Sequence, residues 1–394
     1  MEFTMDVKEL KKLMDKGITV INKKCAVPAL TRLYFQVEEN GIVKMFGTDM
    51  DHYVEVQSNS AYDTCSGAIG IDVDDVKIIS KMNGIVSLES VMPENKNEIG
   101  KVDIKCGKKT VSIIGYQKDN DIIPDMSNTG TKIMSVKENW LLETIVNLSL
   151  YTSYSDSNKM MQVFNFNTKK NRIEALDGHR IGMRSLENQT IYETTENPFE
   201  TVKIHNMCVP VFKKLMDKKS EKNVIIYQNK KNIRIDGNNF TYIIRRVDGE
   251  YYKVDQMLKV PEEFRFIPDR ENILDAMKYD AELAKTDIYS KKPVVFHSTN
   301  GKLCSYIHTG KYEAFDELET FENNMSDSLY IGFNSSYLAD AFSVVDSDKP
   351  VCFGSNAKSP LIINGNEYSF LILPVNIGTD YNKEFSERNK EEVA

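Results

Sequence analysis

One structural plan occurs three times along this chain, at a period of about 130 residues, so any fold must account for the whole length together. Each copy begins with a short alternating strand that runs directly into an amphipathic helix. Phe3, Ile133 and Phe264 mark the same step in the three copies. The strand and helix pairs are expected at residues 2–5 and 7–18, 132–135 and 136–152, and 264–267 and 269–285.

The later part of each copy also corresponds. A strand, a tight polar turn and a second strand are expected at residues 42–49, 172–179 and 303–310. A second helix is expected at 73–82, 207–219 and 335–345, and a closing hairpin at 109–116, 232–246 and 361–373. The repetition predicts an α+β fold of three similar domains, each with two helices against antiparallel strands. Their expected limits are 1–126, 127–258 and 259–377, followed by a charged tail at 378–394.

Composition argues against several classes of protein. Hydrophobic residues make up 41% of the chain, and no stretch approaches the roughly 18 apolar residues that a membrane span requires. Glu2 and Asp6 lie where a secretory signal would be basic. We therefore expect a soluble, cytoplasmic protein without membrane partners. The six cysteines are far apart and often lie in apolar strands, which favours reduced core thiols over a disulfide framework.

Sequence signatures of catalysis are mostly missing. There is no Cys-x-x-Cys pair, His-Glu-x-x-His helix, phosphate-binding glycine loop or Gly-x-Ser-x-Gly elbow. Asp177 and His179 could form an acid/base pair or bind a metal, but an Asp-Gly hairpin turn is the favoured interpretation. Asp49 to His52 occupy the equivalent place in the first copy, whereas His308 in the third has no carboxylate before Glu313. We expect no catalytic residue, metal or cofactor.

Lysines gather on two of the expected helices, although the chain as a whole carries a net charge of −8, which normally argues against a nucleic-acid partner. Val7, Leu10 and Met14 recur at helical spacing, which predicts one buried face and leaves the lysines on another. Such helices can face phosphates, and a solvated helix surface is the alternative. The lysines are Lys8, Lys11, Lys12 and Lys16, and then Lys213, Lys214, Lys218 and Lys219.

Six segments, taken in order, resemble the bacterial DNA polymerase III beta subunit, the sliding clamp. Their order, their spacing and their coverage from Met1 to about Ile377 carry the resemblance, since each piece alone is only moderately specific. The segments are Val-Pro-Ala-Leu at 27–30, Gly-Thr-Asp-Met-Asp at 47–51, Ala-Leu-Asp-Gly-His-Arg-Ile at 175–181, Arg-Val-Asp-Gly-Glu-Tyr at 246–251, Ile-Gly-Phe-Asn-Ser-Ser-Tyr-Leu at 331–338 and Leu-Ile-Leu-Pro-Val-Asn-Ile at 371–377.

The resemblance implies a non-catalytic processivity factor. Two chains would join head to tail into a ring of six clamp domains, with sheets outside and helices lining a pore around duplex DNA. Attraction to phosphates is independent of base sequence and weakens with salt, so closure of the ring, rather than tight contact, would prevent escape. Lys24 is the stronger candidate of the loop pair Lys23 and Lys24. The DNA-facing set is Lys8, Lys12, Lys23, Lys24, Lys213, Lys214 and Lys218.

The resemblance also implies a subunit interface between the first domain of one chain and the third domain of its partner. Pairing of strand edges would join the two domains, with basic and apolar residues on one side and acidic residues on the other. The first side would hold Lys108, Val111 and Ile113. The second side would hold Leu283, Glu313, Asp316 and Glu317.

A second implied site is a pocket for short motifs of the replicative polymerase, the clamp loader and repair proteins. It would combine apolar anchors with a few polar groups, as peptide capture requires. Tyr252 and Gln256 lie where the family usually has proline and arginine, and Asn376 where arginine is common, which indicates a divergent member. The pocket residues are Met161, Leu176, Gly178, His179, Arg180, Ile181, Met257, Leu373, Pro374 and Val375.

Two other functions stay open from the sequence. One is a three-domain enzyme acting on nucleic acid at Asp177 and His179. The other is a clamp-like regulatory protein that binds partners without forming a closed ring on DNA. Solution mass and retention on DNA distinguish these alternatives from a sliding clamp.

Overall fold

The computed structural model forms two compact units. The first comprises Met1–Val146 and Asn188–Asp248, and the second comprises Asn147–Glu187 and the chain from Gly249 onward. The middle copy of the repeat contributes strands to both units, and the domain limits expected from the sequence remain a prediction. The described residues are 1–91, 99–192, 201–286 and 292–377.

The first unit contains a five-stranded antiparallel sheet with β9 at one end of the strand order. Its core side chains alternate along the strands, so that Phe3, Leu88 and Ile104 are fully buried. The order is β5 (Tyr62–Cys65), β1 (Glu2–Asp6), β7 (Ile85–Val91), β8 (Gly100–Cys106) and β9 (Lys109–Gly115).

A nine-stranded antiparallel sheet joins the first and middle repeats within this unit. Strand β18 pairs with β4, placing Tyr242 opposite Val54, and the Tyr242 hydroxyl lies 2.8 Å from Nδ1 of His52. The order is β14 (Thr190–Ile191), β10 (Thr131–Lys137), β16 (Asn223–Gln228), β17 (Asn232–Asp236), β18 (Phe240–Arg245), β4 (His52–Ser58), β3 (Val43–Thr48), β2 (Arg32–Val37) and β6 (Gly67–Asp72).

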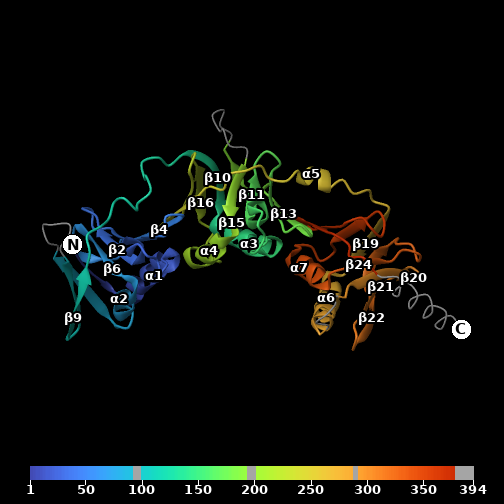
Figure 1. Cartoon of the computed structure of the whole chain (residues 1–394), viewed down its shortest axis with the longest axis horizontal. Helices are drawn as coiled ribbons and strands as arrows, with labels where there is room; N and C mark the ends of the chain where they lie inside the picture. The colour runs from blue at the N-terminus through green and yellow to red at the C-terminus, as the bar shows by residue number, and fades with distance from the viewer. Residues whose placement is uncertain (92–98, 193–200, 287–291, 378–394) are drawn as a thin grey trace. The chain divides into compact units, whose positions relative to one another are not determined.

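Helix α1 (Val7–Gly17) lies against β3 and β4 (Figure 1). The helix and the sheet approach so closely that a Cβ at Gly47 would lie 2.5 Å from the Gly17 carbonyl oxygen, so only glycine fits at this position. The other helices that begin in this unit are α2 (Val73–Ile79), α3 (Glu138–Leu148) and α4 (Val209–Leu215), with 3₁₀ turns at Ile18–Val20, Pro28–Thr31 and Asn206–Cys208.

The second unit contains two antiparallel sheets. One runs in the order β11 (Val163–Asn167), β12 (Arg172–Leu176), β13 (Arg180–Ser185), β27 (Tyr368–Ile372), β26 (Leu361–Asn364), β25 (Val351–Gly354), β19 (Phe264–Pro268) and β23 (Thr320–Asn323). The other runs β22 (Glu313–Leu318), β21 (Lys302–His308), β20 (Val294–Thr299) and β24 (Ile331–Phe333), so β22 ends the strand order.

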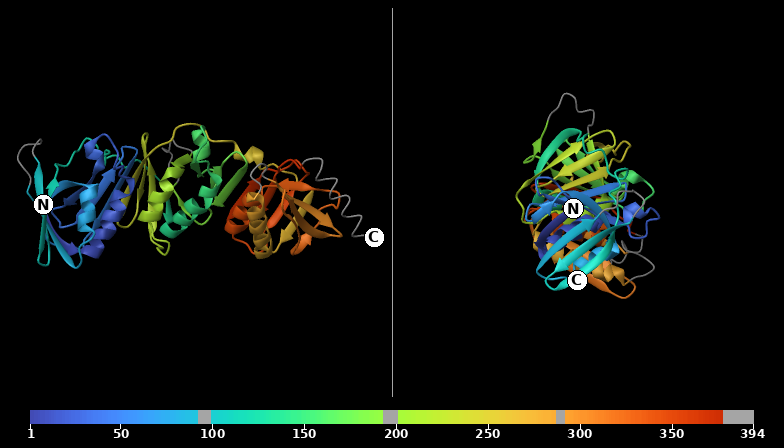
Figure 2. Two further views of the ribbon diagram at one scale, coloured as in Figure 1. Left: turned by 60° about the horizontal axis from the view of Figure 1, so that its bottom comes forward. Right: turned by 90° about the vertical axis from the view of Figure 1, so that its left-hand side faces the viewer.

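Helices α6 (Arg270–Lys285) and α7 (Ser335–Val344) pack against each other in the second unit (Figure 2). Helix α6 also contacts β21 and β22. The Asp269 side chain caps α6 by accepting a hydrogen bond from the Asn272 amide at 2.9 Å, and Asn334 caps α7 in the same way. A short helix, α5 (Val254–Met257), and 3₁₀ turns at Ser149–Tyr151 and Lys159–Gln162 complete the unit.

The strand-to-helix step expected in each copy is confirmed as β1 into α1, β10 into α3 and β19 into α6. Some expectations were wrong in detail. Residues 109–115 form the single strand β9, and the hairpin turns earlier, where Gly107 takes a φ of +58°. The expectation of core thiols holds for Cys208, Cys304 and Cys352 but not for the exposed Cys65. The tail at 378–394 lies outside the described residues.

Candidate DNA-binding, partner-binding and subunit surfaces

Helix α1 divides its faces as the sequence pattern predicted. Val7, Leu10 and Met14 are buried, while Lys8 and Lys12 are exposed. The Lys12 ammonium lies 2.7 Å from Oε1 of Glu9, one turn earlier on the same exposed surface. Such an exposed pair contributes little to stability, so Lys12 can exchange this partner for a phosphate.

Lys16 differs from the other lysines of α1. Its Nζ donates a hydrogen bond to the Leu215 carbonyl oxygen at 3.0 Å, at the last residue of α4. Burial lowers the pKa of Lys16, while the carboxylates of Glu138 and Asp217 act in the opposite direction. This lysine therefore joins two helices, and it does not lie with Lys8 and Lys12 on the exposed face.

Helix α4 is shorter than expected. It ends at Leu215, so Lys213 and Lys214 lie exposed in its last turn, but Lys218 lies in the turn that follows. The Glu138 side chain holds this turn by accepting hydrogen bonds from the Asp217 amide at 2.7 Å and the Ser220 hydroxyl at 2.9 Å. The placement of Lys218 on a helix was therefore wrong, although its side chain is exposed.

The loop after α1 holds Lys23 and Lys24, both exposed. Lys23 lies 3.2 Å from Oδ1 of Asp74, which also accepts from Lys77. These two lysines lower the pKa of Asp74, with Lys77 the stronger influence. Lys24 has no ion pair within the described residues, so its charge is available to a phosphate.

The candidate partner pocket begins at the turn between β12 and β13. Gly178 takes a φ of +88°, and Oδ1 of Asp177 accepts from the amides of His179 and Arg180 at 3.0 and 3.1 Å. These contacts form a hairpin turn, as the favoured interpretation predicted. A Cβ at Gly178 would lie 3.5 Å from the terminal methyl carbon of Met161, so the glycine brings these two candidate residues together.

Arg180 is buried, unlike its neighbours in the turn. Its guanidinium donates to Asp177 Oδ2 at 2.9 Å and Asp340 Oδ2 at 2.6 Å, and it lies 4.1 Å from the centre of the Tyr337 ring. Burial disfavours the charge, but the hydrogen bonds to the two carboxylates more than offset it and raise the pKa of Arg180. Arg180 therefore orders the turn against α7.

The turn rests on an apolar group of side chains that we call the pocket cluster. Leu176 and Ile181 from the predicted set belong to it, and Met161 packs against it partly buried. Sequence reasoning missed its other members, which come from separate strands and share no local pattern. The cluster consists of Leu176, Ile181, Met183, Val254, Ile362 and Leu371, with Tyr251, Tyr252, Leu258, Val260 and Phe353 packed against it.

Three predicted anchors project from the ends of elements that meet at this cluster. Met257, Leu373 and Val375 are 43%, 40% and 37% exposed. The Leu373 amide donates to the His179 carbonyl oxygen at 3.0 Å, which fixes the chain after β27 beside the turn. Exposed apolar side chains set beside a buried core can bind the apolar residues of a peptide.

A cavity of about 770 Å³ adjoins the end of the last strand. Pro374 and Val375 from the predicted set line it together with Tyr330, Lys358 and Ile377. The Val375 amide donates to the Gly332 carbonyl oxygen at 2.7 Å, which holds this wall in place.

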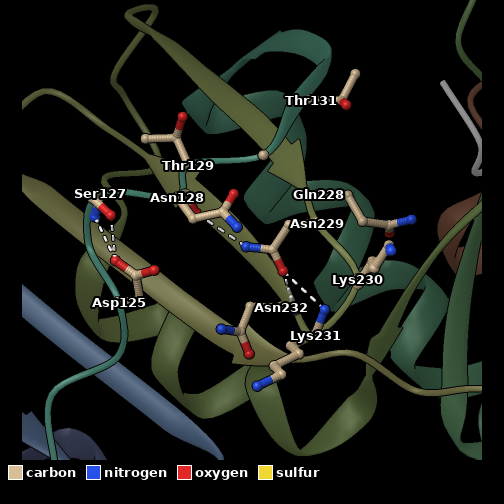
Figure 3. A pocket seen from close by; sticks show the side chains of 11 residues that line it. Asp125, Ser127, Asn128, Thr129, Thr131, Gln228, Asn229, Lys230, Lys231 and Asn232 are labelled. Atoms are coloured by element: carbon tan, nitrogen blue, oxygen red, sulfur yellow. Dashed lines mark hydrogen bonds between the residues drawn. The ribbon is translucent and has the colours of Figure 1, made fainter. Parts of the chain in front are cut away.

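A second cavity, of about 790 Å³, lies in the first unit between residues 125–131 and the turn from β16 to β17. Figure 3 shows its polar lining, in which Asn229 donates from Nδ2 to the Asn128 carbonyl oxygen at 3.0 Å. Asp125 accepts from the Ser127 hydroxyl and amide, and these hydrogen bonds lower the pKa of Asp125. None of the predicted site residues lines this cavity.

The candidate subunit surfaces are two strands that end their sheets. Lys108, in the turn just before β9, and Ile114, near the end of the strand, are exposed, and Val111 and Ile113 are partly exposed between them. On β22, the Phe315 side chain is 46% exposed. End strands present unpaired backbone groups that another strand can use. Ile114 and Phe315 were missed because the resemblance, not the exposure, supplied the predicted set.

The predicted acidic residues of β22 differ in their surroundings. Glu317 lies 2.6 Å from the Lys302 ammonium, and Oε1 of Glu313 accepts from the Tyr306 hydroxyl at 2.5 Å. Asp316 is exposed, and its carboxylate adds to the effect of burial in raising the pKa of Asp280, a buried residue of α6. Leu283, in the last turn of α6, is partly exposed.

Within the described ranges, no group of three His, Cys, Asp or Glu side chains is placed to bind a metal ion. Asp177, which could have been a metal ligand by its sequence, instead accepts a hydrogen bond from the His179 amide and forms an ion pair with Arg180. No helix in the same part of the chain is long and apolar enough to cross a membrane.

Comparison with known proteins gives one consistent family. No protein-family model matches the chain. Curated beta sliding clamps from Pseudomonas aeruginosa and Staphylococcus epidermidis are 21% and 22% identical, covering 96% and 95% of this chain and 100% and 99% of the relatives. A putative DNA polymerase III beta subunit from Eubacterium rectale aligns with a TM-score of 0.83 at 23% identity, and a sliding clamp from Bacillus subtilis with 0.84 at 18%, each covering 96% of this chain and all of the other.

The repeated strand and helix units and the whole-length likeness to solved structures show that this chain has the fold of DNA clamps, with exposed lysines on α1 and α4. Over nearly its entire length, this chain is similar to curated bacterial beta sliding clamps at 21–22% identity.

Proposed function

We propose that this chain is a DNA sliding clamp, a non-catalytic processivity factor that encircles duplex DNA as a homodimeric ring and tethers a replicative polymerase and other partners that carry short binding motifs. The proposal rests above all on the full-length match to beta sliding clamps in sequence and in fold. The lysine surfaces, the pocket cluster and the two end strands supply places for DNA, partner peptide and second subunit.

Ring closure is the property that separates a clamp from a protein that merely binds DNA. The chain is incubated with linear duplex DNA, both ends are then blocked with a bulky protein, and the salt is raised. A closed ring stays on blocked DNA and slides off DNA with free ends, because direct contacts with phosphates weaken as salt rises. Equal loss from both DNAs contradicts the clamp and favours a partner-binding protein that forms no ring.

Replacing Lys12, Lys24 and Lys214 by glutamate is expected to flatten the salt dependence of DNA binding. The logarithm of the binding constant falls by about 0.9 per phosphate neutralised for each unit of log salt, so fewer contacts give a shallower slope. Fluorescence anisotropy with a short duplex at several salt concentrations measures the slope.

The matched control replaces Lys101, Lys105 and Lys311, which are also exposed, by glutamate. It changes the net charge equally but should leave the slope closer to that of the wild type. If the two triple variants behave alike, the DNA path lies elsewhere on the protein.

Replacing Met257 by aspartate is expected to weaken binding of a synthetic hexapeptide containing two leucines and one phenylalanine by at least tenfold. Burial of each large apolar side chain contributes about 1.5 to 3 kcal/mol before the loss of side-chain freedom is subtracted. Isothermal titration calorimetry measures the affinity, and unchanged affinity would place the pocket elsewhere.

The same titration tests selectivity for charge. Because Gln256 and Asn376 carry no positive charge, a version of the peptide with one carboxylate should bind within about threefold of its amide counterpart. A charge-assisted hydrogen bond would otherwise favour the acid. Strong preference for the acidic peptide would contradict the assignment of these two positions.

A further inference from the structure

Helix α5 carries the candidate anchor Met257 but is too short to be stable alone. It spans four residues, Val254–Met257, whereas isolated helices below about 12 residues are marginal in water. Val254 is buried in the pocket cluster and provides one attachment. Tyr252 and Leu258, on either side of the helix, also pack against this cluster, and a second, polar attachment within the helix adds to these apolar contacts in defining where Met257 points.

Asp255 provides that second attachment. Its Oδ1 accepts from Nη2 of Arg172 at 2.6 Å, and its Oδ2 lies 2.9 Å from Nζ of Lys170. Lys170 and Arg172 lie where the chain enters β12, so both oxygens of one carboxylate bind at the same end of this strand. Lys170, and then Arg172, lower the pKa of Asp255, which keeps the carboxylate charged.

Arg172 is itself fixed from within the core. Its Nε donates to Oε1 of Glu174 at 2.7 Å, and Glu174 is 1% exposed. Oε2 of Glu174 accepts from the side-chain Nδ2 of the buried Asn165 at 2.7 Å. A side chain with hydrogen bonds on several sides keeps one geometry. The chain of hydrogen bonds from Asn165 through Glu174 to Arg172 therefore fixes the guanidinium group that binds Asp255.

We propose that Asp255 is a positioning residue for partner binding, which, with Arg172 and Lys170, holds α5 so that Met257 is presented to an incoming peptide. The inference rests on the proposed function, because it concerns the same peptide pocket. It assigns a role to a charged residue that would not itself touch the peptide.

Asp255→Asn is expected to weaken binding of the leucine and phenylalanine hexapeptide roughly threefold to tenfold, as loss of a partly exposed bidentate pair implies. The change retains side-chain size and leaves Arg172 paired with Glu174, so the core keeps its partners. Asp255→Glu, which keeps the carboxylate, should recover most of the affinity. Calorimetry on the full-length protein measures all three.

A double-mutant cycle with Met257→Ala tests whether Asp255 acts through Met257. Once the Met257 side chain is removed, Asp255→Asn should change peptide affinity less than twofold, because the contacts of Asp255 with Arg172 and Lys170 no longer position an anchor. Asp248→Asn is the matched control, since Asp248 accepts from Arg246 at 3.0 Å and is not bound to α5. A general structural effect would lower affinity equally in both backgrounds and would overturn the proposal.

Amide hydrogen exchange gives a readout that does not depend on peptide binding. The Leu258 amide donates to the Val254 carbonyl oxygen at 3.1 Å and the Gln256 amide to that of Lys253 at 3.0 Å. Asp255→Asn should speed exchange at these amides at least fivefold and leave β12 unchanged. Unchanged exchange rates contradict the positioning role of Asp255 even where the wild type binds peptide. A wild type that binds no peptide contradicts the proposed pocket instead.

Discussion

Leu283→Asp is expected to convert the proposed homodimer, of twice 45.1 kDa, largely into monomer and to raise its dissociation constant at least about 100-fold. Leu283 is partly exposed at the end of α6, where burial of an apolar side chain contributes about 1.5 to 3 kcal/mol. Aspartate loses that contribution and adds an unpaired charge to the interface. Sedimentation equilibrium over a range of concentrations measures the change.

Reversing the charges of Lys108 and Lys109 should have a smaller effect, below about tenfold, since exposed ion pairs contribute about 0 to 1 kcal/mol each. Glu317 is already paired with Lys302 in the single chain, which further limits its contribution across an interface. Ile78→Asp, at a residue of α2 that is 41% exposed, is the control and should remain dimeric. A monomeric wild type, or a larger effect from the charge reversal, contradicts the proposed interface.

Asp280→Asn is expected to stabilise the protein at pH 8, by an amount that grows by about 2 to 3 kcal/mol between pH 5 and pH 8. Asp280 is 5% exposed on the buried side of α6, and its Oδ2 has no hydrogen-bond partner among the described residues. Burial, and secondarily the carboxylate of Asp316, raises the pKa of Asp280 to about 7.

The direction follows from proton binding. Between the ordinary pKa of 3.8 and about 7, the folded state holds a proton on Asp280 that the unfolded state has released, so wild-type stability falls as pH rises through this window. Asparagine does not titrate and lacks this decline. Urea unfolding at pH 5 and pH 8 compares the two proteins, with the exposed Asp275→Asn as control. An equal effect of Asp280→Asn at both pH values contradicts the assignment.

The candidate peptide pocket shows which part of a site sequence can reveal. The Asp177-Gly178 turn was predicted because its signal is local: a carboxylate that accepts nearby amides and a glycine that takes a positive φ. Phe353 and Ile362, by contrast, reach the same core from other strands. Their positions follow from pairing of β25, β26 and β27, which no short sequence pattern specifies.

Ion pairs between residues that are far apart in the chain could likewise not be predicted from the sequence. Arg172 and Asp255 are 83 residues apart, and each looks like an ordinary surface charge in its own segment. Their contact exists because β12 and α5 both pack on the pocket cluster. The divergence noted at Gln256 was visible in the sequence, but the role of the residue beside it was not.

The sequence by itself determined the three-copy plan, the strand that leads into each first helix and the buried face of α1, because these depend on spacing along one segment. Tertiary structure alone decided which lysine ammonium groups remain exposed to solvent. Lys8 and Lys16 lie on the same helix, yet Lys16 is partly buried against the Leu215 carbonyl and Lys8 stays in water. The exposure of a charge depends on what packs against it, and that neighbour comes from about 200 residues further along the chain.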